Sequence, residues 1–241
     1  MNRLTFLSTS VLLILGVLVV TFMSAGLGRG QVRPAYPTMA PLAQYLMDHS
    51  AEITLARSAA PDAISRNAKV LVLGQHGYET AVQGVNGFVC EVERGWMSPF
   101  DQAEFWNPKL RGPICFNPAA ARSILPLTIK RTELVLARLS KEQIKENLKA
   151  ALSRKELPAL EGGAMSYMMS NQAYLTDADD HNMSHLMIYA PLTDAASWGA
   201  DLPKSPVMFG GLFQGTPEPI TVFLVPVGKW SDGSPAPMAT P

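Results

Sequence analysis

Residues 69–118 read KVLVLGQHGYETAVQGVNGFVCEVERGWMSPFDQAEFWNPKLRGPICFNP, and this stretch decides the predicted fold because it holds both cysteines and the strongest turn signal. Asn86-Gly87 favours a two-residue type I′ turn, since both central residues of that turn need positive φ. Side chains alternate between the two faces of the resulting hairpin, so its register follows by counting. The face that we expect to be buried carries the pairs Val85–Phe88, Gln83–Cys90, Ala81–Val92 and Glu79–Arg94.

The opposite face of this hairpin carries Glu91 and Glu93 and is therefore predicted to face water. Before the hairpin, residues 70–73 form a short continuous apolar run that ends at a glycine, which is typical of a strand buried on both faces. Together the three segments predict an antiparallel meander.

The rest of the chain adds helices and further strands. Pro41 opens a predicted helix over residues 41–56, in which His49 lies on the apolar face as an expected core residue. Ser140 and Gln143 form a capping box at the start of another helix. The remaining predictions are helices over residues 119–125 and 133–139, and strands over residues 164–170, 185–190 and 220–225. The expected fold class is α+β, a largely antiparallel sheet of about six strands with three or four helices on one side.

Composition sets the broad class of the protein. The chain has 241 residues, of which 47% are hydrophobic and 17% charged, and this balance is typical of a globular core. The formal net charge is zero, which argues against nucleic-acid binding, because that function needs a basic surface.

The N-terminus predicts export. Arg3 precedes an uncharged apolar run and then small residues, so residues 1–26 are expected to be a signal peptide or, if uncleaved, a membrane anchor. No cysteine follows this run, which argues against a lipid anchor. The protein is then periplasmic or secreted, and it meets a membrane only through the uncleaved segment. Residues 27–40 are a predicted linker, 41–230 a single domain and 231–241 a flexible tail.

The predicted export bears on whether the two cysteines form a disulfide. In an oxidising compartment, Cys90 and Cys115 are expected to form a disulfide. The alternative is a nucleophilic Cys90 activated by His76, but a reactive thiol needs a reachable, electropositive setting and Cys90 lies on the predicted core face.

Common catalytic motifs are absent from the sequence: there is no GxSxG elbow, phosphate loop, dinucleotide fingerprint, HExxH or paired CxxC. One polar cluster, TDADDHNMSHLM, combines imidazoles and carboxylates that could bind a divalent metal, zinc or copper. The candidate ligands are His181, His185, Asp177 and Asp179. An ordinary polar surface loop explains the same residues, because Asp, Asn and Ser are common in turns.

Several segments resemble a group of exported bacterial proteins that have no assigned function. The segments are NGFVCEVERGWMSPF, FWNPKLRGPICFNPAAARSILP, MSYMMS and HLMIYAPLTDAASWGA, and they cover most of the chain after the apolar run. The relatives have a His-x-His-x-His pattern where this chain has Met183 in the middle position. The resemblance therefore carries over only His181 and His185 as metal ligands, and it implies no activity.

Three functions compete at this point. The first is a non-catalytic exported domain that binds a ligand or partner, which is favoured because no catalytic set assembles. The second is a metal-binding protein or metal-dependent enzyme that uses His181 and His185, and the third is a cysteine-dependent enzyme that uses Cys90.

Overall fold

The computed structural model describes residues 36–177, 183–210 and 216–237. The chain divides into two compact units, residues 1–33 and 34–241, and all described residues belong to the second. The predicted signal segment therefore lies outside the described residues. Within the described ranges, no helix combines the length and the apolar character that crossing a membrane requires.

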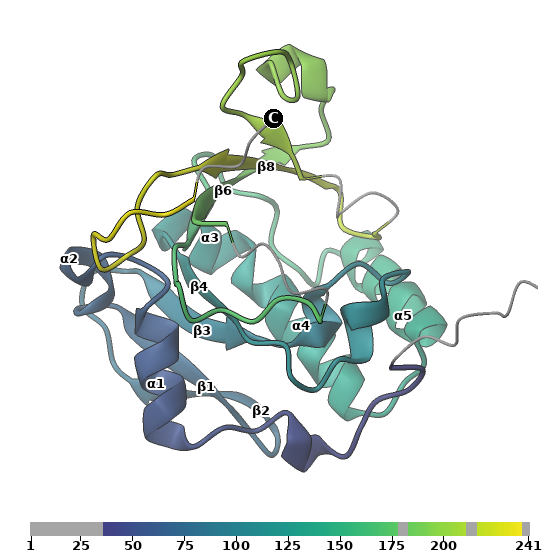
Figure 1. The fold of residues 1–241 in the computed structure, drawn as a ribbon. Coiled ribbons are helices and arrows are strands. Elements are labelled where there is room, and N and C mark those ends of the chain that lie inside the picture. Colours follow the sequence, from purple (N-terminus) through teal and green to yellow (C-terminus); the bar gives the residue numbers. More distant parts are fainter. Residues whose placement is uncertain (1–35, 178–182, 211–215, 238–241) are drawn as a thin grey trace, which may run out of the picture. The chain divides into compact units, whose positions relative to one another are not determined.

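The described unit is an α+β domain built on one mixed sheet (Figure 1). Its strands are β1 (Lys69–Gly74), β2 (Gly77–Val82), β3 (Val89–Glu93), β4 (Gly112–Phe116), β5 (Met165–Met168), β6 (His185–Pro191), β7 (Met208–Phe209) and β8 (Ile220–Pro226). Its helices are α1 (His49–Arg57), α2 (Asp62–Ser65), α3 (Pro118–Ser123), α4 (Leu125–Leu136) and α5 (Lys141–Ser153), with short 3-10 turns at Leu42–Gln44, Gly95–Met97, Ala103–Trp106 and Ala195–Trp198.

The strand order is β2-β1-β3-β4-β5-β6-β8-β7. All neighbouring strands are antiparallel except β1 and β3, which are parallel. The predicted largely antiparallel pattern is confirmed, and the three C-terminal strands appear as β5, β6 and β8. The prediction missed β4, whose Pro113 is unusual in a strand, and the two-residue β7.

The predicted hairpin around Asn86-Gly87 is wrong. Of the predicted meander, the antiparallel pairing of β1 with β2 is confirmed, through a turn between Gly74 and Gly77, whereas β3 pairs in parallel with the other side of β1. Gly87 does have a positive φ of 79°, and Asn86 accepts a hydrogen bond from the Phe88 amide. The chain thus bends here, but Asn86 lacks the positive φ that the predicted type I′ turn requires, and the bend carries the chain across the start of β1 rather than back along β2.

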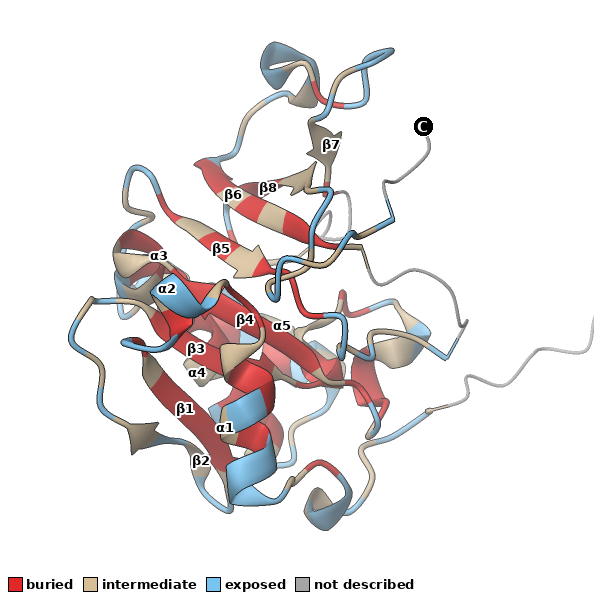
Figure 2. Ribbon diagram, turned by 60° about the vertical axis from the view of Figure 1, so that its left-hand side comes forward, coloured by how far each residue is buried: buried red, intermediate tan, exposed pale blue. Residues whose placement is uncertain are grey.

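Helices cover both faces of the sheet, so the expected one-sided arrangement is also wrong (Figures 1 and 2). Successive side chains along a strand point to opposite faces of the sheet, so each strand contributes to two separate core layers. Leu71 and Phe116 pack with α3 and α4 on one face, whereas Val70 and Cys115 pack with α1 on the other. A separate cluster joins Leu73 to the aromatic residues of the β3–β4 connection and to α4 and α5.

Local capping signals set the helix starts. The capping box of Ser140 and Gln143 is present at the start of α5, as predicted. The predicted helix over residues 41–56 instead breaks, and α1 begins after Asp48, whose carboxylate accepts the amides of Ser50 and Ala51. His49 consequently lies exposed in the first turn of α1 and is not a core residue.

A buried ion pair connects α1 to the sheet. Glu52 and Arg94 are almost fully buried, and the guanidinium of Arg94 donates to the Glu52 carboxylate at 2.8 Å. The same carboxylate oxygen accepts the amide of Leu73 at 3.0 Å, and Arg94 also donates to the carbonyl of Tyr45 at 2.8 Å. Charge-assisted hydrogen bonds of this pair therefore join α1, β1 and the turn that ends at Tyr45.

The predicted disulfide is confirmed. Cys90 of β3 and Cys115 of β4 lie directly opposite each other, with 4.0 Å between their Cα atoms, and both are fully buried. The bridge thus joins neighbouring strands in the centre of the sheet.

Removing this disulfide should destabilise the protein. The Cys90→Ala/Cys115→Ala variant is expected to lose about 3.5 kcal/mol of unfolding free energy, because the open chain gains entropy when unfolded. Urea unfolding curves measure the loss, and the same curves for the reduced wild-type protein should give a similar value. A loss below about 1 kcal/mol would contradict the expectation.

Candidate functional site

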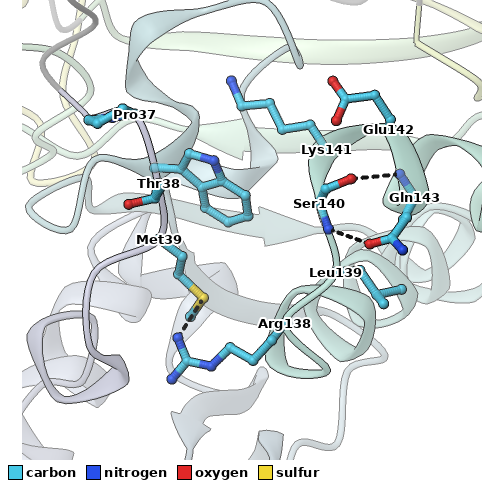
Figure 3. A pocket seen from close by; sticks show the side chains of 10 residues that line it. Pro37, Thr38, Met39, Arg138, Leu139, Ser140, Lys141, Glu142 and Gln143 are labelled. Carbon is cyan, nitrogen blue, oxygen red and sulfur yellow. Dashed lines mark hydrogen bonds between the residues drawn. The ribbon is translucent and has the colours of Figure 1, made fainter.

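A surface pocket of about 530 Å³ lies between the segment that leads into the domain and the α4–α5 connection (Figure 3). Its volume is within the range of about 300–1,000 Å³ that small-molecule sites occupy. Pro37, Thr38 and Met39 form one wall, and the opposite wall is the run from Arg138 to Gln143. Trp106, which ends the 3-10 turn after β3, contributes an aromatic surface.

Arg138 occupies an unusual backbone position in this pocket. The α4 helix ends in a Schellman motif, in which the Arg138 amide bonds to the Val135 carbonyl and the Leu139 amide to the Leu134 carbonyl. Arg138 is the residue with positive φ, 63°, at a position where glycine is preferred because a Cβ atom is strained there. The chain therefore places an arginine where local backbone energy favours glycine.

The guanidinium of Arg138 is weakly engaged. It donates to the sulfur of Met39 at 3.4 Å, and no carboxylate pairs with it within the described ranges. Most of its fork of N–H donors is consequently available to a ligand in the pocket.

Lys141 adds a second positive charge. Its ammonium donates to the Phe100 carbonyl at 2.7 Å and lies 4.6 Å from the centre of the Phe105 ring. Burial lowers its pKa. This fixed ammonium keeps two further N–H donors and contributes to the positive potential of the pocket.

The amino end of α5 is already satisfied. Ser140 accepts the Gln143 amide, and the Glu142 carboxylate interacts with its own backbone amide and with Ser140, which lowers its pKa. A ligand anion would therefore bind Arg138 rather than the amino end of α5, because the Glu142 carboxylate already occupies that helix terminus.

The structure disperses the predicted metal ligands that it describes. Asp177 accepts hydrogen bonds from Tyr174 and Tyr36 and pairs with Lys109 at 3.3 Å, and these contacts lower its pKa to about 2. His185 is buried at the start of β6, where its Nδ1 donates to the Met183 carbonyl at 2.6 Å and burial lowers its pKa.

Two of the four predicted ligands, Asp179 and His181, lie outside the described residues, so the metal site remains a prediction. Within the described ranges, no group of three or more His, Cys, Asp or Glu side chains is arranged to bind a metal ion. The cysteine-nucleophile hypothesis is wrong, because Cys90 is in the disulfide and His76 lies exposed in the β1–β2 turn.

The sequence interpretation missed Arg138, Trp106 and the segment 37–39 as parts of one site. These come from three separate stretches of chain, and only the arginine directly after a helix, where glycine is usual, offered a local signal. Comparisons with protein-family models, with curated proteins and with solved structures found no match.

Proposed function

We propose that this protein is an exported, non-catalytic domain that binds a small organic anion in the pocket between residues 37–39 and the α4–α5 connection. The observation that carries the proposal is Arg138, whose guanidinium lines a pocket of about 530 Å³ and has no carboxylate partner among the described residues. The central disulfide supports export, since such bonds persist in oxidising compartments.

The pocket chemistry suggests the ligand class. Arg138 offers a planar pair of donors that suits a carboxylate, and Lys141 strengthens the positive field. Trp106, Met39 and Leu139 offer apolar surface beside these charges. A carboxylate attached to an aromatic or aliphatic group fits both features, with the acid on Arg138 and the apolar part against Trp106.

Replacing Arg138 by glycine should separate stability from binding. The Arg138→Gly variant is expected to gain up to about 1 kcal/mol of unfolding free energy, because glycine adopts positive φ without strain. It should lose binding of small carboxylates such as benzoate and indole-3-acetate. NMR titration of the Trp106 indole and the Ser140–Gln143 amides measures binding, and urea unfolding measures stability.

The chain supplies a matched control at the end of α5. Lys155 has φ of 57° and occupies the same position in a second Schellman motif, with its amide on the Leu152 carbonyl and the Glu156 amide on the Ala151 carbonyl. Lys155→Gly should therefore be stabilising to a similar degree and leave carboxylate binding intact. Equal binding by Arg138→Gly and the wild type, or no carboxylate-dependent shifts in the wild type, would refute the proposed site.

A further inference from the structure

A small, partly enclosed cavity lies between β3, α4 and β6, beside Glu218 and Ile220. Its volume is about 40 Å³, and its polar lining consists of Glu93, Thr128, Arg131, Tyr189 and Glu218. Apolar side chains form the remaining walls. A water molecule needs roughly 10–15 Å³ of such volume and two to four polar partners, so this cavity has room for two or three waters.

The polar lining includes buried atoms without partners. Arg131 of α4 donates to the Glu218 carboxylate at 2.8 Å and to the carbonyls of residues 96–98 at 3.2–3.3 Å. Both side chains of the ion pair are more than nine-tenths buried. Nevertheless Nε of Arg131 and Oε2 of Glu218 have no hydrogen-bond partner among the described residues. Leaving such groups unsatisfied is costly, which favours an occupant that can both donate and accept.

Glu93 faces the same cavity from β3. The charged or titratable groups around it are Arg131 of α4, Tyr189 of β6, Glu218, Tyr78 of β2 and, on the same face of β3, Glu91. The hydroxyl of Tyr189 is within 2.9 Å of the Ser166 hydroxyl, and Glu91 is fully buried with both carboxylate oxygens unpartnered among the described residues. Among the described residues, Arg131 is thus the single cation that lines the cavity.

We propose that this cavity is a hydration site, in which water bridges the Glu93 carboxyl group to Arg131 and Glu218 and through which Glu93 takes up and releases a proton. Two carboxyl groups share one guanidinium here, so Glu93 is the group that gains most from being neutral while Glu218 keeps the direct ion pair. Burial raises the pKa of Glu93 to about 7, and Arg131 opposes that rise.

A proton site of this kind links folding to pH. The Glu93 carboxyl has a pKa of about 7 when folded and an ordinary value of 4.5 when unfolded, so the folded protein binds more protons between these values. The proton-linked stabilisation is fully present below pH 4.5 and is lost as pH rises to about 7. In this window, the unfolding equilibrium constant should change by up to tenfold per pH unit.

Carbon-13 NMR of the glutamate carboxyl groups tests the proton site in the wild-type protein directly. We expect the Glu93 carboxyl signal, assigned by its absence from Glu93→Gln, to titrate near pH 7 and to persist in Glu146→Gln, which changes an exposed glutamate of α5. Burial also raises the pKa of Glu91, so the Glu91 signal is assigned separately by its absence from Glu91→Gln. The pH dependence of urea unfolding should flatten in Glu93→Gln only. Titration of the Glu93 signal below about pH 5.5 in the wild type would overturn the proposal.

Water is tested separately by magnetic relaxation dispersion, which counts long-lived internal waters. Thr128→Ile should fill the cavity and reduce the dispersion amplitude, whereas Thr128→Ser should keep the wild-type amplitude. An unchanged amplitude in a folded Thr128→Ile variant would show that no long-lived water occupies this cavity and would overturn the hydration site.

Discussion

Replacing Glu52 by alanine is expected to lower the free energy of unfolding by about 3–5 kcal/mol, because the change leaves the buried guanidinium of Arg94 without its counter-charge. The variant also removes the acceptor of the Leu73 amide in β1. Both losses occur where water has little access, so solvent does little to compensate them. Urea unfolding followed by tryptophan fluorescence measures the effect.

An exposed ion pair of equal length provides the control. Asp62 and Arg66 also approach to 2.8 Å, but both side chains are largely exposed on α2. Asp62→Ala should therefore change stability little, since exposed pairs contribute little and are screened. If Glu52→Ala and Asp62→Ala lowered the free energy of unfolding by comparable amounts, burial would not explain the contribution of the Glu52–Arg94 pair to stability.

Gly84→Ala is expected to cost at least about 3 kcal/mol, because a Cβ atom has no room at this position. It would lie 2.1 Å from the Lys69 amide nitrogen and 2.6 Å from the Ala68 carbonyl carbon, both of which are backbone atoms. Here the β2–β3 connection crosses the start of β1, held by the Val85 amide on Asn67 and the Lys69 amide on Phe88. Accommodating a methyl group would separate the parallel β1 and β3 strands.

Gly162 provides the matched control for this substitution. A Cβ atom there meets no heavy atom within 4 Å, so Gly162→Ala should be neutral or slightly stabilising through the unfolded chain. Urea unfolding of the two variants compares them directly. Near-wild-type stability of Gly84→Ala would mean that the crossing connection is not packed as described.

Local sequence signals predicted most helices and strands correctly. The prediction failed where the fold depends on pairing between strands that are distant in the chain. The capping box of Ser140 and the continuous apolar runs of β5, β6 and β8 depend on neighbouring residues, so they can be read from sequence. Asn86-Gly87 indicates that the chain turns, but it does not indicate which strand β3 pairs with after the turn. The parallel pairing of β1 with β3 is a contact between distant residues, and the exposure of Val85, 88%, follows from it.

Buried charges were the second source of error. Glu91 and Glu93 were expected to face water because alternation in the assumed hairpin placed them opposite its apolar face. Glu91 is fully buried instead, and Glu93 is partly buried and lines the cavity beside α4. Glu52 likewise looks like a surface residue of an amphipathic helix until Arg94 is known to meet it. Such positions are recognised only from their partners, which lie far away in the chain.

Both margins of the sheet discourage addition of a further strand. β2, at one end, carries exposed Glu79 and Thr80, and a row of such polar side chains disfavours docking of an apolar strand from another molecule. β7, at the other end, contains only Met208 and Phe209, too short a template for extended pairing. The eight-stranded sheet thus resists edge-to-edge aggregation.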